Sequence, residues 1–372
     1  MKKGKEVISR SQLFAMIILF NFGTALVIPI GFQGERGVWL AILLAIPGGV
    51  LLFLLFDYLF RAYPDLILSG YMKKVFGTYI GWSLSLLYIG FFIYISARNL
   101  REAGDLLVSA AYDQTPLIVV EAAMIVVVIY ILYKGLEVFF RLAEIYLILI
   151  FSLGVIGNVL MIFSGIIDLS NLYPVFGDGR WKTTLIAAYP YIFLFPFAEL
   201  ICFTTIFPNI NRVQQVRKTG ILAILVSGLF LSWTHGVEIA ILGEEIYSRS
   251  TFPLLTAIGF VNIAEFIQRI DALVILTLII GAFFKMTVYA YASMAIAADI
   301  FKVLEQRKLA YPVGVVILFI SNMSAWSFPE HAEEGLIVLH WLLPTFGVII
   351  PLFLLIVHWL KKVKGFQVDR KL

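Results

Sequence analysis

Long runs of apolar residues alternate with short polar connections along the whole chain. Each run can cross the roughly 30 Å hydrocarbon layer of a bilayer, which takes about 20 helical residues. Backbone groups in lipid must be hydrogen-bonded within their own segment, so each run is predicted to be a helix. The pattern predicts about ten membrane-spanning helices, at residues 10–31, 36–60, 82–107, 116–133, 138–164, 183–207, 214–241, 268–299, 310–328 and 335–360.

The first run is interrupted near its middle by small and polar residues. Asn21, Gly23 and Thr24 lie at bilayer depth, and Pro29 follows them. A helix that restarted at Thr24 would present free backbone amides and the positive end of its dipole at the interruption. Residues Phe22, Gly23, Thr24 and Ala25 are therefore a candidate binding site for a carboxylate.

The sixth run is also interrupted, at Pro196. Proline has no amide proton and clashes with the preceding turn, so we expect a break before it and a second half-helix that begins with it. Carbonyl groups freed near Phe195 would suit an ammonium group. Phe195 and Phe197 are candidates to close over an apolar side chain of the ligand, and Glu199 is a candidate to bind its amine or to relay a proton. The alternatives are that the two phenylalanines face lipid and that Glu199 bonds to another helix.

The two interrupted runs are five runs apart. Because five is odd, the two halves of the chain would have opposite orientations in the membrane. Interrupted helices at matching places in two inverted halves point to a binding site near the bilayer midplane. We therefore expect one membrane domain over residues 1–372, an all-α inverted five-plus-five repeat with halves at about 10–164 and 183–360.

Composition supports a membrane protein. The chain is 61% hydrophobic and 14% charged, with a mean hydropathy of +0.96, and a soluble core of this size could not bury so much apolar surface. Most of the Lys and Arg residues fall in the connections on the N-terminal side, which predicts that both termini are cytoplasmic. The opposite side carries only Arg36, Arg98, Arg101, Arg180, Lys182, Arg249 and Arg269.

Catalysis is the function class with the least support. The four histidines, His235, His331, His340 and His358, are scattered without metal-ligand spacing. The single cysteine, Cys202, excludes an internal disulfide. We expect no catalytic residues, no metal and no cofactor.

A charge cluster is predicted at the inner end of the fifth run. Glu137, Arg141 and Glu144 are spaced i, i+4, i+7 and so share one helix face. Such a cluster would hold the cytoplasmic ends of helices together, and it could also serve as a gate.

Several short motifs resemble, in the right order, those of the spore germination B-subunit permeases. This family comprises the membrane-embedded subunits of bacterial spore germinant receptors, within the amino acid/polyamine/organocation superfamily. One departure is Gln268, which stands where the resemblance leads us to expect an acidic residue before Arg269. The motifs are residues 8–14 with 22–26 and Pro29, 141–145, 195–199, 242–243 with 252–253, and 266–272 with 281–287.

The resemblance implies a germinant such as an amino acid, a place in the spore inner membrane, and two partners, a larger A subunit and a C lipoprotein. A proton-coupled amino acid transporter is the alternative, since a sensor and a carrier can share one site. A scaffold subunit with a vestigial pocket is a third possibility.

Lys285 lies midway along the eighth run, where a charge needs compensation. In transporters of the implied fold, a sodium ion can lie between the first and eighth spans. We predict that the ammonium of Lys285 replaces this ion by coordinating carbonyl groups at the break in the first span. The alternative is a lysine that extends its charge to the membrane surface.

Overall fold

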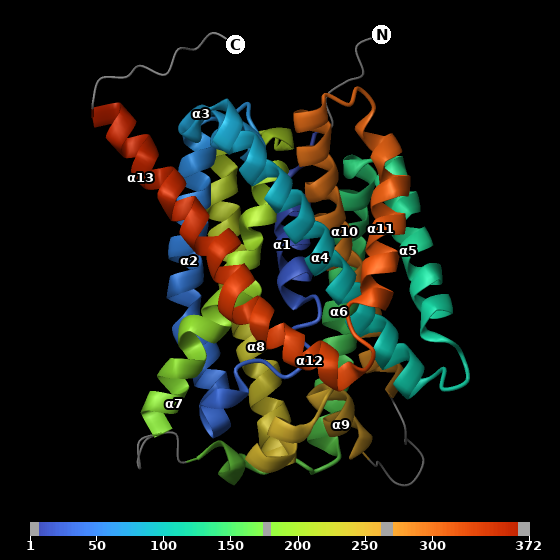
Figure 1. Cartoon of the computed structure of the whole chain (residues 1–372). Coiled ribbons are helices and arrows are strands. Elements are labelled where there is room, and N and C mark those ends of the chain that lie inside the picture. The colour runs from blue at the N-terminus through green and yellow to red at the C-terminus, as the bar shows by residue number, and fades with distance from the viewer. Residues whose placement is uncertain (1–6, 174–179, 262–270, 364–372) are drawn as a thin grey trace.

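A computed structural model describes residues 7–173, 180–261 and 271–363. Within these residues the regular secondary structure is helical, apart from a single bridge between Ile8 and Ile210, and turns and loops join the helices. The α-helices are α1 (Arg10–Phe22), α2 (Val38–Ala62), α3 (Leu68–Phe76), α4 (Thr78–Ala110), α5 (Leu117–Lys134), α6 (Leu136–Phe163), α7 (Arg180–Ile186), α8 (Val213–Arg249), α9 (Pro253–Gly259), α10 (Asp271–Phe301), α11 (Ala310–Met323), α12 (Phe328–Ile337) and α13 (Ile350–Val363) (Figure 1).

The predicted all-α membrane architecture with about ten spans is confirmed. In the described residues, eight helical segments are long and apolar enough to cross a membrane. The first and ninth predicted spans correspond to shorter helices, α1 with 13 residues and α11 with 14. The start of α1 and the end of α13 lie at the same end of the bundle, which agrees with an even number of crossings (Figure 1). The predicted start of the eighth span, at residue 268, lies outside the described residues.

The boundary between the last two spans differs from the prediction. We expected the ninth span to reach residue 328, but α11 ends at Met323. The side chain of Ser327 accepts a hydrogen bond from the Glu330 amide, and Pro329 lies in the first turn of α12. These are helix-start signals, so the tenth span begins at Phe328 rather than at 335.

The first span is broken, but its second half is not a helix. A capping box between Ser9 and Gln12 starts α1, and the helix stops at Gly23, whose φ is +32°. The expectation of a half-helix from Thr24 was wrong, because the chain there forms turns up to a short 3-10 segment, Phe32–Gly37. Side chains of α8 accommodate this path by bonding to carbonyl groups that an α-helix would have used internally, those of Ala25 and Ile30.

The sixth span contains the predicted break before Pro196. After α7, an irregular segment (Ala187–Phe197) has extended backbone at Tyr189 and again at Phe195, each directly before a proline. A residue that precedes proline is disfavoured in helical conformation. The chain then continues as a 3-10 segment, Ala198–Thr205.

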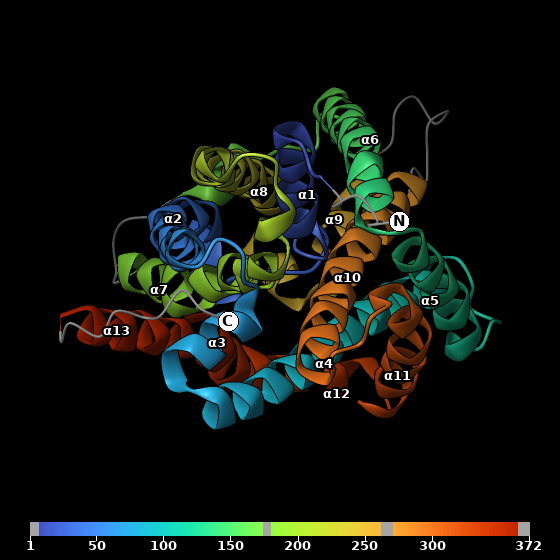
Figure 2. The ribbon, with the colours of Figure 1, turned by 90° about the horizontal axis from the view of Figure 1, so that it is seen from above.

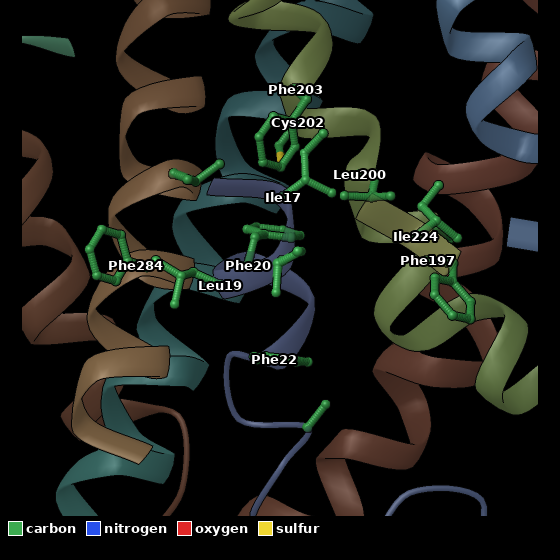
Figure 3. Close-up of a cluster of buried hydrophobic side chains, with 14 of the residues drawn as sticks. Ile17, Leu19, Phe20, Phe22, Phe197, Leu200, Cys202, Phe203, Ile224 and Phe284 are labelled. Atoms are coloured by element: carbon green, nitrogen blue, oxygen red, sulfur yellow. The ribbon is translucent and has the colours of Figure 1, made fainter. Parts of the chain in front are cut away.

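The first half of the broken first span is buried between other helices. Helix α1 contacts α6, α8 and α10 (Figure 2). Phe20 of α1 packs edge-on against Phe203 of the sixth span, with ring centres 5.2 Å apart. Figure 3 shows Phe20 in the middle of this apolar core, with Phe203 above it and Phe284 of α10 to its left. A Cβ atom on Gly281 of α10 would overlap the carbonyl oxygen of Gly23, so glycine permits α10 to reach the break.

Candidate ligand-binding cavity

A cavity of about 340 Å³ lies between the irregular parts of the first and sixth spans, α4 and α12. This volume is within the usual range for sites that bind small molecules. Apolar residues dominate its wall, and polar side chains are grouped among them. The lining residues include Ile28, Pro29, Ile30, Gln33, Ile95, Arg98, Asn99, Glu102, Ile192, Phe195, Glu199, Arg249, His331, Leu336 and Leu339.

Helix α4 provides a polar face of the cavity. Arg98 is only 6% exposed; its Nη2 donates a 2.9 Å hydrogen bond to the carbonyl oxygen of His331, and its Nη1 lies 3.6 Å from Glu334. His331 in turn lies 3.6 Å from Glu102. The side-chain oxygen of Asn99 is buried and has no hydrogen-bond partner in the described part of the chain. Buried polar atoms normally have a partner, so this face is suited to a polar ligand.

One member of a buried ion pair, Glu199, also lines the cavity. Lys285 Nζ lies 2.6 Å from Glu199 Oε2, and the two side chains are 0% and 2% exposed. The same ammonium lies 4.0 Å from the ring centre of Phe195 and 5.7 Å from that of Phe20. Glu199 and Phe195 line the cavity, whereas Lys285 is not among its lining residues. Each buried charge therefore compensates the other.

Lys285 also touches the break in the first span. A Cβ atom at Gly23 would lie 2.5 Å from Lys285 Cδ, so the aliphatic stem of the lysine packs over this glycine. The predicted neighbourhood is thus present, with the ammonium directed at Glu199. Coordination of span-one carbonyl groups by Lys285 stays a prediction.

The other candidate ligand residues are not brought to the cavity wall. Phe22, Gly23, Thr24 and Ala25 are buried but do not line it. The amides of residues 26–28 already bond to Phe22 and Thr24 carbonyl groups at 3.0–3.2 Å, which leaves them engaged in turns. Phe197 faces neither lipid nor the cavity, because it packs into the contact of α2 with α8, where its ring meets Gly49.

The predicted charge cluster lies on α6, away from the cavity. Arg141 and Glu137 form an ion pair at 2.5 Å, and their side chains are 67% and 41% exposed. Glu144 follows on the same helix. Exposed ion pairs contribute about 0–1 kcal/mol to the free energy of unfolding. We therefore expect no large stabilising effect from this pair.

Sequence reasoning missed the polar face of α4. It placed Arg98 and Arg101 near the outer end of the span at 82–107 and counted them only as outer charges, but the helix continues to Ala110 and buries both. The available signal was the i, i+4 spacing of Arg98 with Glu102 and of Arg101 with Asp105, because ionisable residues within a span commonly mark a functional site.

A second buried network was also missed, on α8. His235 and Glu238 are both fully buried. His235 Nδ1 lies 2.9 Å from Glu238 and 3.0 Å from the Tyr247 hydroxyl, and His235 Nε2 lies 2.9 Å from the carbonyl oxygen of Ala25. A carbonyl oxygen can only accept, so Nε2 carries a proton. This network fixes the turns that lead to the cavity residues 28–30.

The fold is similar to that of membrane transporters of known structure. It is similar to the structure of Mhp1, a nucleobase-cation-symport-1 family transporter, in a closed conformation with bromovinylhydantoin bound (TM-score 0.64, 13% identity, 89% of this chain and 75% of that chain). It is also similar to MhsT in complex with L-phenylalanine (TM-score 0.55, 13% identity, 96% and 99%). At these identities the likeness concerns the fold alone.

The family of this protein follows from its sequence. A family model described as spore germination protein matches residues 7–329. The chain is 42% identical over 361 residues to Spore germination protein KB of Bacillus subtilis (strain 168), with 96% of both chains covered, and 23% identical to Spore germination protein YndE of the same organism, covering 87% and 88%. The chain therefore belongs to the spore germination protein family, and the resemblance seen in its motifs is confirmed.

Proposed function

We propose that this protein is the permease-like subunit of a bacterial spore germinant receptor, in which it binds a small germinant such as an amino acid and triggers germination. The family membership and the similarity to Spore germination protein KB support this role. The observation that carries the binding function is the cavity beside both broken spans, with buried charges of both signs in its wall.

The lining suits a zwitterion with an apolar side chain. Arg98 on α4 offers a cation for a carboxylate, and Glu199 offers an anion for an ammonium group. Ile95, Ile192 and Leu339 provide an apolar surface between and beside them. In this proposal the ligand carboxylate binds the side chain of Arg98, and not the helix N-terminus that the sequence had predicted at Thr24.

We also propose that the protein works in a complex in the spore inner membrane, with a larger A subunit and a C lipoprotein. Similarity over 119 residues, at 32% identity, to Spore germination protein A2 of Bacillus subtilis (strain 168) agrees with a receptor role. The distribution of Lys and Arg supports cytoplasmic termini. In this proposal residues 1–372 form one domain of two inverted halves, and Glu137, Arg141 and Glu144 tie helix ends together on the cytoplasmic side.

The second candidate function is proton-coupled amino acid transport, which the similarity to transporter structures favours. Deletion of the gene separates the two functions. Loss of spore germination with unchanged amino acid uptake by vegetative cells is expected for the receptor subunit. Reduced uptake with normal germination would contradict the proposal. Purified protein that binds no small molecule, despite a germination defect, would instead indicate a scaffold.

A further inference from the structure

The wall of the cavity contains a carboxylate and an aromatic ring that face the same cation. Lys285 Nζ is 2.6 Å from Glu199 and 4.0 Å from the ring centre of Phe195. A carboxylate combined with an aromatic face binds ammonium groups well, through charge and through the negative face of the ring. Glu199 and Phe195 are reachable from the cavity, because both line it.

The cation at this position is the ammonium of Lys285, which does not line the cavity. Lys285 is fully buried and belongs to α10, and its stem packs over Gly23 at the break of the first span. Its charge reaches Glu199 from within the protein, and the cavity borders the same carboxylate and the same ring. A second ammonium that arrived through the cavity would meet the same carboxylate and would be repelled by Lys285.

We propose that Glu199 and Phe195 form a subsite for the primary ammonium group of a ligand, and that Lys285 occupies this subsite as a built-in competitor. Ligand binding then exchanges one ammonium for another at Glu199. This inference rests on the proposed ligand-binding function and adds to it the competition between Lys285 and the ligand ammonium, and a route for the signal. Because the lysine stem lies on Gly23, displacement of Lys285 acts directly on the break in the first span.

Chemical rescue tests the subsite without knowledge of the germinant. The Lys285→Ala variant removes the atoms of a propylamine from a position beside the cavity. Purified full-length Lys285→Ala protein in lipid nanodiscs is titrated at neutral pH with propylamine, or with 1-propanol as the uncharged control of the same shape. We expect propylamine to raise the melting temperature with saturation, and propanol to have little effect.

The double variant Lys285→Ala/Glu199→Gln provides the matched test, because it lacks both charges and leaves no unpaired carboxylate. Its half-saturating propylamine concentration should be about tenfold or more higher than that of Lys285→Ala, which corresponds to about 1.4 kcal/mol or more. Lys362→Ala, at the exposed end of α13, should behave like the unmodified protein. Equal effects of propylamine and propanol on Lys285→Ala, or equal propylamine binding by the double variant, would overturn the subsite.

A further variant keeps the test valid if Lys285→Ala does not fold. Lys285→Met retains the stem over Gly23 and removes only the charge, so it should bind propylamine more tightly than the unmodified protein does. Unchanged affinity would overturn the role of Lys285 as a competitor. The amine titrations test the subsite, whereas the gene deletion tests the proposed function. Germination of the deletion spores is measured without propylamine, so either proposal can fail while the other stands.

Discussion

Lys285 on α10 and Glu199 on the sixth span form a fully buried ion pair, with 2.6 Å between Nζ and Oε2. The pair joins the break in the first span to the wall of the cavity, because the lysine stem contacts Gly23 and the glutamate lines the cavity. Changes on either side of the pair should therefore affect the response to a germinant.

Gly23→Ala should abolish the germinant response while the protein still inserts into the membrane. The backbone φ of +32° costs a side chain about 1–2 kcal/mol, and the new Cβ atom would displace Lys285 Cδ. Gly77→Ala is the matched control, since Gly77 also has a positive φ but no atom within 4 Å of its Cβ position. The dose–response curves of germination are compared for spores that carry Gly23→Ala and spores that carry Gly77→Ala. A normal curve for Gly23→Ala would refute the prediction.

The response should not require sodium. If the ammonium of Lys285 serves in place of a bound sodium ion, replacing sodium with choline at equal osmolarity leaves germinant binding and germination unchanged. Binding of the germinant to purified protein in the two buffers provides the measurement. A strong dependence on sodium would argue against this role of Lys285.

Arg98→Gln should weaken germinant binding about tenfold or more, because a charge-assisted contact with a carboxylate is lost. Arg249→Gln is the matched control. Arg249 also lines the cavity, but its side chain is exposed and pairs with Glu245, so its replacement should have a small effect. Binding isotherms for the two variants check this, and equal losses would exclude a specific role for Arg98.

Tyr247→Phe should lower the free energy of unfolding by about 1–3 kcal/mol, because the hydroxyl bonds buried groups at Ile30 and His235 that would lose a partner. Tyr311→Phe changes an exposed ring on α11 and should have almost no effect. Thermal unfolding of both variants in the same detergent measures the difference. An unchanged melting temperature for Tyr247→Phe would mean that the network on α8 does not support the turns of the first span.

The sequence alone predicts the all-helical membrane fold, because the length and polarity of each apolar run are local properties that lipid selects directly. It also predicts the breaks at Gly23 and before Pro196, since glycine and proline act on their own turn of helix. For Glu199, its position in a span predicts that it must be paired, protonated or exposed to water.

Only the tertiary structure decides what surrounds these breaks. The path after Thr24 depends on His235 and Tyr247 of α8, which bond to carbonyl groups of Ala25 and Ile30 that a helix would otherwise have used. The cavity depends on α4 and α12, far apart in the chain, and the partner of Glu199 comes from α10. Such contacts arise from packing between distant segments, and local sequence patterns carry no record of which segments will meet.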